Sequence, residues 1–382
     1  MKNSIQRPLK VLFVLDKLSG RLGKKRRYSL PRMLGQKGHN VKVVCFPSRD
    51  SDYQWVVESI GLKHIDIIGI RENNFIQRFN NINRIIDSYK PDIVHMVAQH
   101  RYYLYPAMRK LINPLNKEKW IVDFDSPPLW TKESHWLKNK LNFIFQIGFD
   151  GISTTEKENV YKRFNRSLRP IYEVSIGIDV DAIKTKEYNN EDTMIKIRKF
   201  IYIGNVARMR KLDLLIEAIS DVHKKISGSQ EIHFDFFGAG DSVDEFRAAI
   251  KKKKLEELIK YKGLIQQEEL FQLMCNYDAG ISYIPYEMYD NAPPLKTLEY
   301  MAAGIFAIGS DTQGNKLYIE NGQNGIEFKN TKESIANVLI DSIENGLPKY
   351  YIDNALKGIS KYDWSEVVNN NLIPMYHDLL MG

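Results

Sequence analysis

Short apolar strands alternate with helical segments along the chain, and this alternation limits the fold more than any other feature. The run "VLFVL" (11–15) is followed by a glycine-containing loop, a helical segment ending at Gly38–His39, and the strand "VKVVCF". The alternation starts again at "KFIYIGN" (199–205), with the helix "RKLDLLIEAISDVHKKI" behind it. Continuously apolar strands joined through helices are typical of parallel sheets covered on both faces. We therefore predict an α/β fold with two Rossmann-like, doubly wound domains facing a cleft.

The boundary between these domains is predicted from length and polarity. A chain of 382 residues exceeds the size at which one hydrophobic core keeps growing. The polar stretch from Gly177 to Thr193 suits a linker. The last segment, "DWSEVVNNNLIPMYHDLL", has a helical pattern with Pro374 as a kink or break. We predict an N-terminal domain over residues 1–178, a C-terminal domain over 179–362 and a closing helix at 363–382; the family resemblance described below implies that this helix returns to the N-terminal domain.

Composition favours a cytoplasmic protein with anionic partners. The apolar run near the start is too short for a signal peptide or a membrane span. Cys45 and Cys275 have no metal-binding or redox spacing, which indicates core thiols in a reducing compartment. The formal net charge of +8 favours nucleic acid, phosphorylated small molecules or an anionic membrane, although any single lysine is better explained as solvated surface.

Basic residues crowd the loop after the strand "KFIYI". Arg208, Arg210 and Lys211 lie between the strand end at Gly204 and the next helix. Cationic side chains beside the free N–H groups of a helix start make an anion site suited to phosphate. The alternative is a solvated basic turn, and the position at a strand's carboxyl end favours the anion site.

A second candidate is the helix start in "NAPPLKTLEYMAAG" (291–304). Asn291 is predicted to cap this helix, with a proline at its first position and Gly304 at its end. Lys296 and Glu299 are three residues apart and share one face. The alternative is a weak surface ion pair, but in an otherwise apolar helix we expect the carboxylate to accept ribose hydroxyl protons and the helix start to attract a diphosphate.

These motifs together resemble the GT-B glycosyltransferases, in particular the large retaining family four group. In that family a "GR….KG" motif follows the first strand of the C-terminal domain, and "E-x7-E-A-x-A-x-G" closes the donor site. Here the corresponding stretches are "GNVARMRKLDLLIEA" and "NAPPLKTLEYMAAG". The similarity extends to "GH" after the first helix, "PDIVH" (91–95), "SIGID" near the linker and the returning last helix. It implies that the C-terminal domain holds a nucleotide diphosphate sugar and the N-terminal domain the acceptor, without a bound metal or another cofactor.

The resemblance also implies roles for single residues. Glu299 matches the family glutamate that binds the nucleotide ribose, and Arg210 or Lys211 matches the lysine on the diphosphate. Gly20 falls in the glycine loop near the donor phosphates, and Ile265 lies where the family frames the base.

The chain departs from the family pattern at two positions. Asn205 replaces the family arginine, so Arg208 is expected to supply that charge. Asn291 stands where the first glutamate of the pair contacts the sugar, which leaves the donor sugar open. This matches a "P-x-K-x-x-E-Y" variant in which Lys296 adds a phosphate contact. The predicted donor-binding residues are Gly20, Arg208, Arg210, Lys211, Ile265, Asn291, Leu295, Lys296 and Glu299.

Catalytic candidates come from the N-terminal half. His95 ends a predicted strand near where family histidines meet the transferred sugar, and it is preferred to His100; a satisfied structural histidine is the alternative. In "DFDSPPLW", Asp123 and Asp125 form an Asp-x-Asp, which holds a metal in the other major glycosyltransferase fold. Asp125 is predicted here as a general base or acceptor contact, with a capping aspartate as an equal alternative. We predict His95 and Asp125 as catalytic and no metal ligands.

Two other stretches remain ambiguous. "GAGDSVDEF" (238–246) lacks the third glycine of a dinucleotide fingerprint and is interpreted as a phosphate-side or structural loop. The basic, aromatic segment "LWTKESHWLKNKLNFIFQ" (129–146) and the basic residues 21–27 suit a membrane surface or a lipid-linked acceptor, whereas an ordinary packed helix is the alternative for the segment.

The sequence thus favours a hexosyltransferase-type glycosyltransferase acting on a glycan or lipid-linked acceptor. Its expected setting is bacterial surface polysaccharide synthesis at the inner face of the cell membrane. A nucleotide-sugar epimerase or phosphorylase on the same fold is the main alternative. A basic nucleic-acid-binding protein is disfavoured, because no stacked aromatic motif or reading helix is evident.

Overall fold

The chain forms two compact units. This computed structural model describes residues 7–15, 25–71, 74–97, 103–124, 146–157, 160–161, 167–189, 191–226 and 231–382. The N-terminal unit comprises Met1–Gly177 together with Trp364–Gly382, and the C-terminal unit comprises Ile178–Asp363. These boundaries lie one residue from those expected from the sequence.

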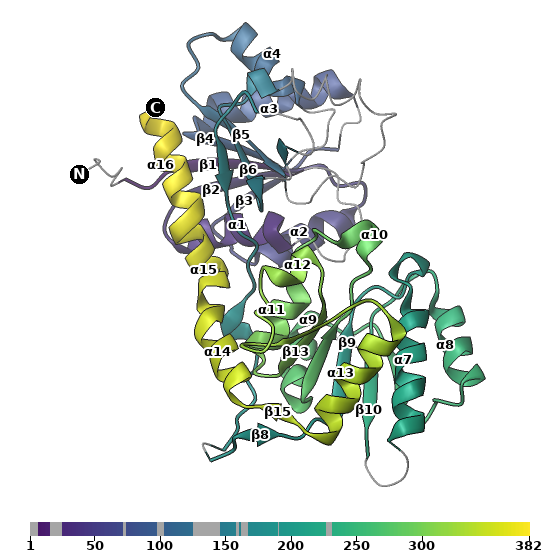
Figure 1. Ribbon diagram of the computed structural model, residues 1–382. Coiled ribbons are helices and arrows are strands. Elements are labelled where there is room, and N and C mark those ends of the chain that lie inside the picture. The colour runs from purple at the N-terminus through teal and green to yellow at the C-terminus, as the bar shows by residue number, and fades with distance from the viewer. Residues whose placement is uncertain are drawn as a thin grey trace. The chain divides into compact units, whose positions relative to one another are not determined.

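The N-terminal unit is built on a seven-stranded parallel sheet in the order β3-β2-β1-β4-β5-β6-β7. Its first strand, β1, lies in the middle and pairs with both β2 and β4 (Figure 1). The strands are β1 (Lys10–Leu15), β2 (Asn40–Cys45), β3 (Asp66–Gly69), β4 (Ile93–Val97), β5 (Lys119–Phe124), β6 (Gly151–Thr154) and β7 (Ile171–Glu173).

Helices cover both faces of this sheet, which explains why its strands are apolar throughout. Alternate side chains of β1 enter different cores: Val11, Phe13 and Leu15 enter one, and Leu12 and Val14 enter the other. The first core contains α1 (Lys25–Gln36), α2 (Asp50–Ile60) and the C-terminal helices α15 (Trp364–Val367) and α16 (Ile373–Met381). The second contains α3 (Phe75–Tyr89) and α4 (Leu104–Ile112), beside the short helix η3 (Gln146–Gly148).

The C-terminal segment is an integral part of this unit. Trp364 packs so closely on Gly177 that a Cβ built there would lie 2.6 Å from the indole ring, and Tyr172 donates a hydrogen bond of 2.6 Å to Asp378. The predicted returning helix is therefore present, but the helix does not break at Pro374. The π-helical turn η8 (Val368–Leu372) precedes α16, and the proline lies in the first turn of α16, where a missing N–H is tolerated.

The C-terminal unit contains a six-stranded parallel sheet in the order β11-β10-β9-β12-β13-β14. The chain builds outward from β9 through β10 and β11, then returns to the other side of β9 with β12. The strands are β9 (Lys199–Ile203), β10 (His233–Phe237), β11 (Ile259–Gly263), β12 (Ala279–Ser282), β13 (Phe306–Ser310) and β14 (Ile326–Phe328). A small antiparallel pair joins β8 (Met194–Ile195) to β15 (Leu347–Pro348).

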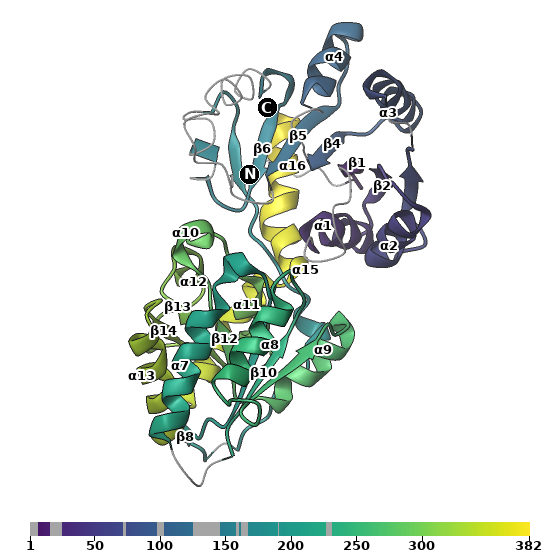
Figure 2. The same cartoon turned by 90° about the vertical axis from the view of Figure 1, so that its right-hand side faces the viewer.

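Helices also cover this second sheet. The main core packs the sheet against α7 (Leu212–Lys225), α8 (Val243–Lys252) and α13 (Lys332–Glu344). Helix α11 (Leu295–Ala302) lies directly on the sheet through Tyr300, whose Cγ would be 2.2 Å from a Cβ built on Gly280. The shorter helices are α9 (Gln267–Leu273), α10 (Tyr286–Tyr289), α12 (Gln313–Lys316) and α14 (Tyr350–Ile359), with the 3-10 turns η4 (Val180–Ala182), η5 (Arg208–Arg210), η6 (Met274–Asn276) and η7 (Ser360–Tyr362). Figure 2 shows the helices of this unit from a second side.

The predicted α/β class with two parallel, doubly wound sheets is confirmed. Among the described residues, no helix is both long and apolar enough to cross a membrane.

Candidate functional site

The strand order of the C-terminal unit selects one place for a ligand. Strands β9 and β12 are neighbours, but the chain leaves them toward opposite edges of the sheet. In open parallel sheets, ligands bind outside the carboxyl ends of strands at such a switch point. The two loops that leave it are 204–211 after β9 and 283–294 after β12. They contain four of the nine predicted donor-binding residues, and three more lie on α11, which follows the second loop.

Two contacts hold these loops together at the start of α7. Lys211, in the left-handed backbone region (φ 49°), precedes the helix and makes no side-chain cap. Its Nζ lies 2.5 Å from Glu287 Oε1 of α10, and its carbonyl accepts a hydrogen bond of 3.2 Å from the Tyr283 hydroxyl. The Lys211 and Glu287 side chains are 57% and 60% exposed, so this ion pair is open to solvent and an anionic ligand can compete for it.

The two arginines of η5 have different surroundings. The Arg210 guanidinium lies 4.1 Å from the centre of the Tyr289 ring, a cation–π contact, and its Nε is buried without a hydrogen-bond partner among the described residues. Arg208 pairs instead with Glu245 of α8 at 2.9 Å, and its side chain is 82% exposed. The structure therefore places Arg210 against α10 and Arg208 against α8.

Glycines allow the β9 and β10 loops to approach each other closely. Gly238 follows β10 at φ 145°, and a Cβ built on it would lie 1.8 Å from the Gly204 carbonyl oxygen. A Cβ on Gly240 would lie 2.1 Å from the Val206 carbonyl oxygen. The "GAGD" stretch thus packs backbone to backbone against the loop after β9, in line with a structural interpretation of this motif.

Helix α11 begins without a side-chain cap. Its N-cap residue is Pro294 in extended backbone (φ −84°, ψ 112°), and the helix starts at Leu295. The prediction that Asn291 caps it, with a proline in the first helical position, is wrong. Ala292 and two prolines separate Asn291 from the helix start, which leaves the asparagine in the turn after α10. The N-cap side chain therefore does not compete with an anion for the first N–H groups of α11.

Lys296 and Glu299 form an ion pair on the first turns of α11, with Nζ 2.6 Å from Oε2. The Glu299 side chain is fully buried, whereas the Lys296 side chain is 32% exposed. This differs from the surface pair considered as the alternative, because one partner is removed from water. A buried carboxylate costs free energy unless it is paired, so the contact to Lys296 compensates the burial of Glu299.

A buried polar cluster fixes the position of this helix start. Thr297 of α11 donates to Asn315 Oδ1 at 2.7 Å, and Ser282 at the end of β12 donates to the same oxygen at 3.1 Å. The Asn315 amide donates to the carbonyl oxygens of Ser282 and Ser310. Asn315 thereby ties α11 to the ends of β12 and β13, a role that nothing in the sequence indicated.

The remaining donor-binding candidates are placed as follows. Leu295 is the first residue of α11 and is half-buried, as is Asn291. Ile265 is half-buried two residues beyond Gly263, at the end of β11. Gly20, Asp125 and His100 lie outside the described residues, as do 129–145 and 21–24 of the predicted membrane-facing stretches.

His95 lies inside the N-terminal unit rather than at an open strand end. It is fully buried in β4, stacks on Phe13 at 4.9 Å between ring centres, and its Nδ1 lies 2.7 Å from the Tyr376 hydroxyl of α16. Its Nε2 lies 3.8 Å from Asp123 Oδ2. These contacts match the structural alternative considered for this histidine.

Asp123 forms the centre of this buried network. Arg26 of α1 contacts both of its oxygens, at 2.9 and 3.0 Å, and also donates to the Val174 and Ser175 carbonyls. Burial by itself raises the pKa of Asp123, but the charge of Arg26 and the contact to His95 outweigh it and hold that pKa well below its usual range. Sequence spacing did not reveal Arg26 or Tyr376 as partners. Within the described ranges, no group of His, Cys, Asp or Glu side chains could hold a metal ion.

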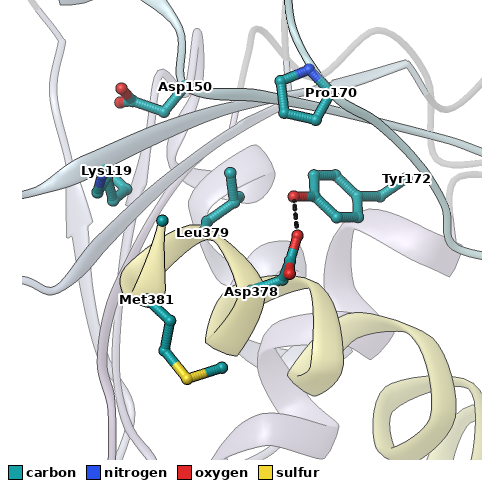
Figure 3. A pocket seen from close by; sticks show the side chains of 8 residues that line it. Lys119, Asp150, Pro170, Tyr172, Asp378, Leu379 and Met381 are labelled. Carbon is teal, nitrogen blue, oxygen red and sulfur yellow. Dashed lines mark hydrogen bonds between the residues drawn. The ribbon is translucent and has the colours of Figure 1, made fainter. Parts of the chain in front are cut away.

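A cavity of about 720 Å³ lies at the opposite end of this sheet. Its lining includes Lys119 at the start of β5, Asp150 just before β6 and Pro170 just before β7, with Asp378 and Met381 from α16 (Figure 3). It therefore opens at the amino ends of the strands, away from the carboxyl ends where doubly wound sheets bind nucleotides.

Comparison with known proteins finds a family match within the C-terminal unit. Residues 185–358 match the family described as Glycosyl transferases group 1. The UDP-N-acetylglucosamine–peptide N-acetylglucosaminyltransferase GtfA subunit of Streptococcus pneumoniae is 25% identical over 224 residues, which are 57% of this chain and 41% of that protein. The chain thus spans about two fifths of the length of the curated relatives it matches.

Solved structures extend the likeness to the whole chain. A glycosyltransferase from Rickettsia africae superposes with a TM-score of 0.76 at 16% identity, over 97% of this chain and 99% of that one. The pneumococcal O-GlcNAc transferase GtfA, in complex with UDP and GlcNAc, superposes with a TM-score of 0.72 at 12% identity, over 98% and 100%. The expected GT-B fold is confirmed.

Proposed function

Because this chain has the GT-B fold and carries a glycosyl transferases group 1 domain, we propose that it is a glycosyltransferase that uses a nucleotide diphosphate sugar. One observation supports this most strongly. Arg210 and Lys211 from the loop after β9, and Lys296 from the first turn of α11, supply cations near the β9/β12 switch point, and the start of α11 has no side-chain cap.

This arrangement suits the chemistry of the leaving group. In glycosyl transfer the bond from the sugar carbon to the diphosphate oxygen breaks, a bond to the acceptor oxygen forms, and the acceptor loses its proton to a base. Negative charge therefore grows on the diphosphate in the transition state, and preplaced cations and helix N–H groups stabilise it. Arg210, Lys211 and Lys296 supply this positive charge, with Arg208 at the rim, and on this basis we propose a metal-independent reaction.

Glu299 is the proposed ribose contact. A carboxylate has about four lone-pair sites, so Glu299 can accept ribose hydroxyls in addition to its bond to Lys296. Since the Glu299 side chain is fully buried here, the residues that cover it must move when the donor binds. Ile265, Leu295 and Asn291 are proposed to line the base and sugar ends of the donor.

The general base is proposed to be Asp125 rather than His95. Asp125 lies outside the described residues; in the sequence it directly follows Phe124, the last residue of β5, and this position supports the proposal. His95 is fully buried against Tyr376 and Asp123, so any effect of its side chain on the site is transmitted through these neighbours.

A uridine diphosphate sugar is the first donor to test. The pneumococcal relative is named for UDP-N-acetylglucosamine, and its structure holds UDP and GlcNAc. For the acceptor we propose a glycan or a lipid-linked glycan of bacterial surface polysaccharide synthesis, met at the inner face of the cell membrane. The formal charge of +8 is consistent with an anionic membrane as the place of reaction.

A thermal-shift panel of nucleotide diphosphate sugars tests the donor assignment, because a ligand that binds the folded state raises the melting temperature. Glu299→Gln keeps the shape of the side chain and removes its charge. Both Glu299→Gln and Glu299→Ala should weaken donor binding about tenfold or more, because charged hydrogen bonds contribute about 1.5–3 kcal/mol. Glu333→Ala, at an exposed position in the first turn of α13, is the matched control.

Unchanged donor affinity in both Glu299 variants would refute the ribose assignment. Products must also be analysed with donor alone, because an isomerised nucleotide sugar formed without acceptor would indicate an epimerase instead.

A further inference from the structure

Helix α4 exposes aliphatic side chains on the outside of the N-terminal unit. Leu111 and Ile112 in its last turn are 81% and 66% exposed, and Leu115 in the turn that follows is 87% exposed. Figures 1 and 2 show α4 at an outer edge of this unit. Three large aliphatic side chains so close together in water indicate a surface that another apolar phase covers.

These side chains are not needed for packing. The inner face of α4 is formed by Tyr105, Pro106 and Arg109, all buried. The Tyr105 ring packs at 4.8 Å from Phe75 and 5.3 Å from Phe79 of α3. The helix is therefore anchored through one face, and the apolar residues on its outer side and in the next turn add nothing to the core.

The exposed apolar surface continues onto neighbouring turns. Helix η3 packs against α4, and its Ile147 is 54% exposed. Arg169 donates a hydrogen bond of 2.6 Å to the Ile147 carbonyl, which places Leu168, 45% exposed, beside it. Below, "the α4 surface" means Leu111, Ile112, Leu115, Ile147 and Leu168. It lies at the amino ends of β5, β6 and β7, on the same edge as the cavity in Figure 3.

The carboxylates around this surface are paired with Arg109 and Lys110, and further lysines lie beside them. Between residues 104 and 119 there are four cations and one anion. The anion, Glu118, is bound to Arg109 at 3.1 Å, and Arg109 also binds Asp87 of α3 at 2.7 Å. Asp150 from the neighbouring turn is bound to Lys110 at 3.0 Å. Lys117 lies exposed two residues after Leu115, and half-buried Lys119 follows it. An anionic partner therefore meets cations, while the nearby carboxylates are already paired.

We propose that the α4 surface is a membrane-contact surface, with its aliphatic side chains among the acyl chains and its lysines at anionic phospholipid headgroups. Aliphatic side chains flanked by lysines are the pattern of interfacial membrane binding. The central contacts of protein interfaces are more often Trp, Tyr and Arg, whereas leucine is under-represented there. This inference rests on the proposed function, because it names the surface that brings a lipid-linked acceptor and the enzyme together.

Vesicle sedimentation tests the proposal on the full chain. The probes are phosphatidylcholine vesicles with and without about 30% phosphatidylglycerol. The test variant combines Leu111→Ser, Ile112→Ser and Leu115→Ser. The control combines Ile76→Ser, Met194→Ser and Leu317→Ser, which replace exposed apolar residues elsewhere (52%, 48% and 46% exposed).

The wild type should bind the anionic vesicles, and higher salt should weaken this binding. The test variant should bind at least about tenfold more weakly, because the apolar area that enters the bilayer is lost. The control should bind as the wild type does. Equal binding by wild type and test variant, or no binding by the wild type, would overturn the proposal. So would a wild-type dimer that the test variant loses without any vesicle binding, since the surface would then meet a second copy.

Donor binding separates this proposal from the proposed function. The thermal shift with UDP-N-acetylglucosamine is measured on the same proteins without vesicles, and the test variant should keep the wild-type shift. Vesicle binding without any donor binding would leave the α4 surface supported and the donor assignment refuted. Donor binding without vesicle binding would refute the α4 surface alone.

Discussion

The two sheets carry charged residues near their carboxyl ends in contrasting environments. In the N-terminal unit, the Arg26 and Asp123 side chains are 3% and 0% exposed and contact each other through both carboxylate oxygens. In the C-terminal unit, Lys211 and Glu287 are 57% and 60% exposed and share a single contact. A buried bidentate pair holds structure together and is closed to ligands, whereas an exposed pair can exchange one partner for a diphosphate.

Lys296 and Glu299 combine features of both environments. The carboxylate is buried as in the first pair, and the ammonium reaches solvent as in the second. An anion can therefore approach Lys296 from the solvent side while Glu299 still holds the lysine in place. The first turn of α11 therefore has a fixed position and also presents a positive charge to solvent. A site that binds a diphosphate needs both properties.

The largest expected effect is on the buried pair. Arg26→Met leaves Asp123 buried without its main partner and should lower the free energy of unfolding by about 3–5 kcal/mol. Urea denaturation followed by circular dichroism measures this. Arg208→Met is the control, because its contact to Glu245 lies at the surface and its loss should leave the urea midpoint unchanged. A loss below about 1 kcal/mol in Arg26→Met would show that the buried network does not stabilise the unit.

The same pair should produce a pH dependence whose size depends on Arg26. Because the folded pKa of Asp123 is lowered, the ionised group stabilises the fold above about pH 4, and this stabilisation is lost as the pH falls toward the folded pKa. In Arg26→Met, burial is the largest influence on that pKa and raises it, so acidification should relieve the buried charge instead.

The difference in unfolding free energy between wild type and Arg26→Met should therefore shrink on acidification, by up to about 1.4 kcal/mol per pH unit below about pH 4. Urea titrations at several pH values check this. A difference that stays constant with pH would mean that Asp123 is not the group that Arg26 stabilises.

The smallest expected effects separate the three cations in the loop after β9. Arg210→Met should weaken UDP binding about tenfold, since its guanidinium is fixed on Tyr289 near the switch point. Lys211→Met should weaken it about fivefold, because the lysine must first leave Glu287. Arg208→Met should change it less than about twofold, because its side chain contacts α8.

Calorimetric titration with UDP gives these affinities, and none of the three substitutions should alter the urea midpoint. An effect of Arg208→Met as large as that of Arg210→Met would instead support the sequence-based assignment of Arg208 to the diphosphate.

Local periodicity was sufficient for the architecture. Continuously apolar strands alternating with helices predicted both sheets, because parallel strands must be apolar on both faces. The spacing of Lys296 and Glu299 predicted their shared face, since residues three apart are neighbours on a helix. The prediction of an Asn291 cap failed because the two prolines that follow move the helix start to Leu295.

Burial and long-range pairing were decided only by the tertiary structure. Arg26 and Asp123 are 97 residues apart, and His95 and Tyr376 are 281 residues apart. Neither contact follows from sequence spacing, because each depends on which strands are neighbours and on where α16 returns to the sheet. The sequence by itself determined that this chain forms two α/β units with cations after one strand; the pairing of strands and helices decided which charges are buried and which reach solvent.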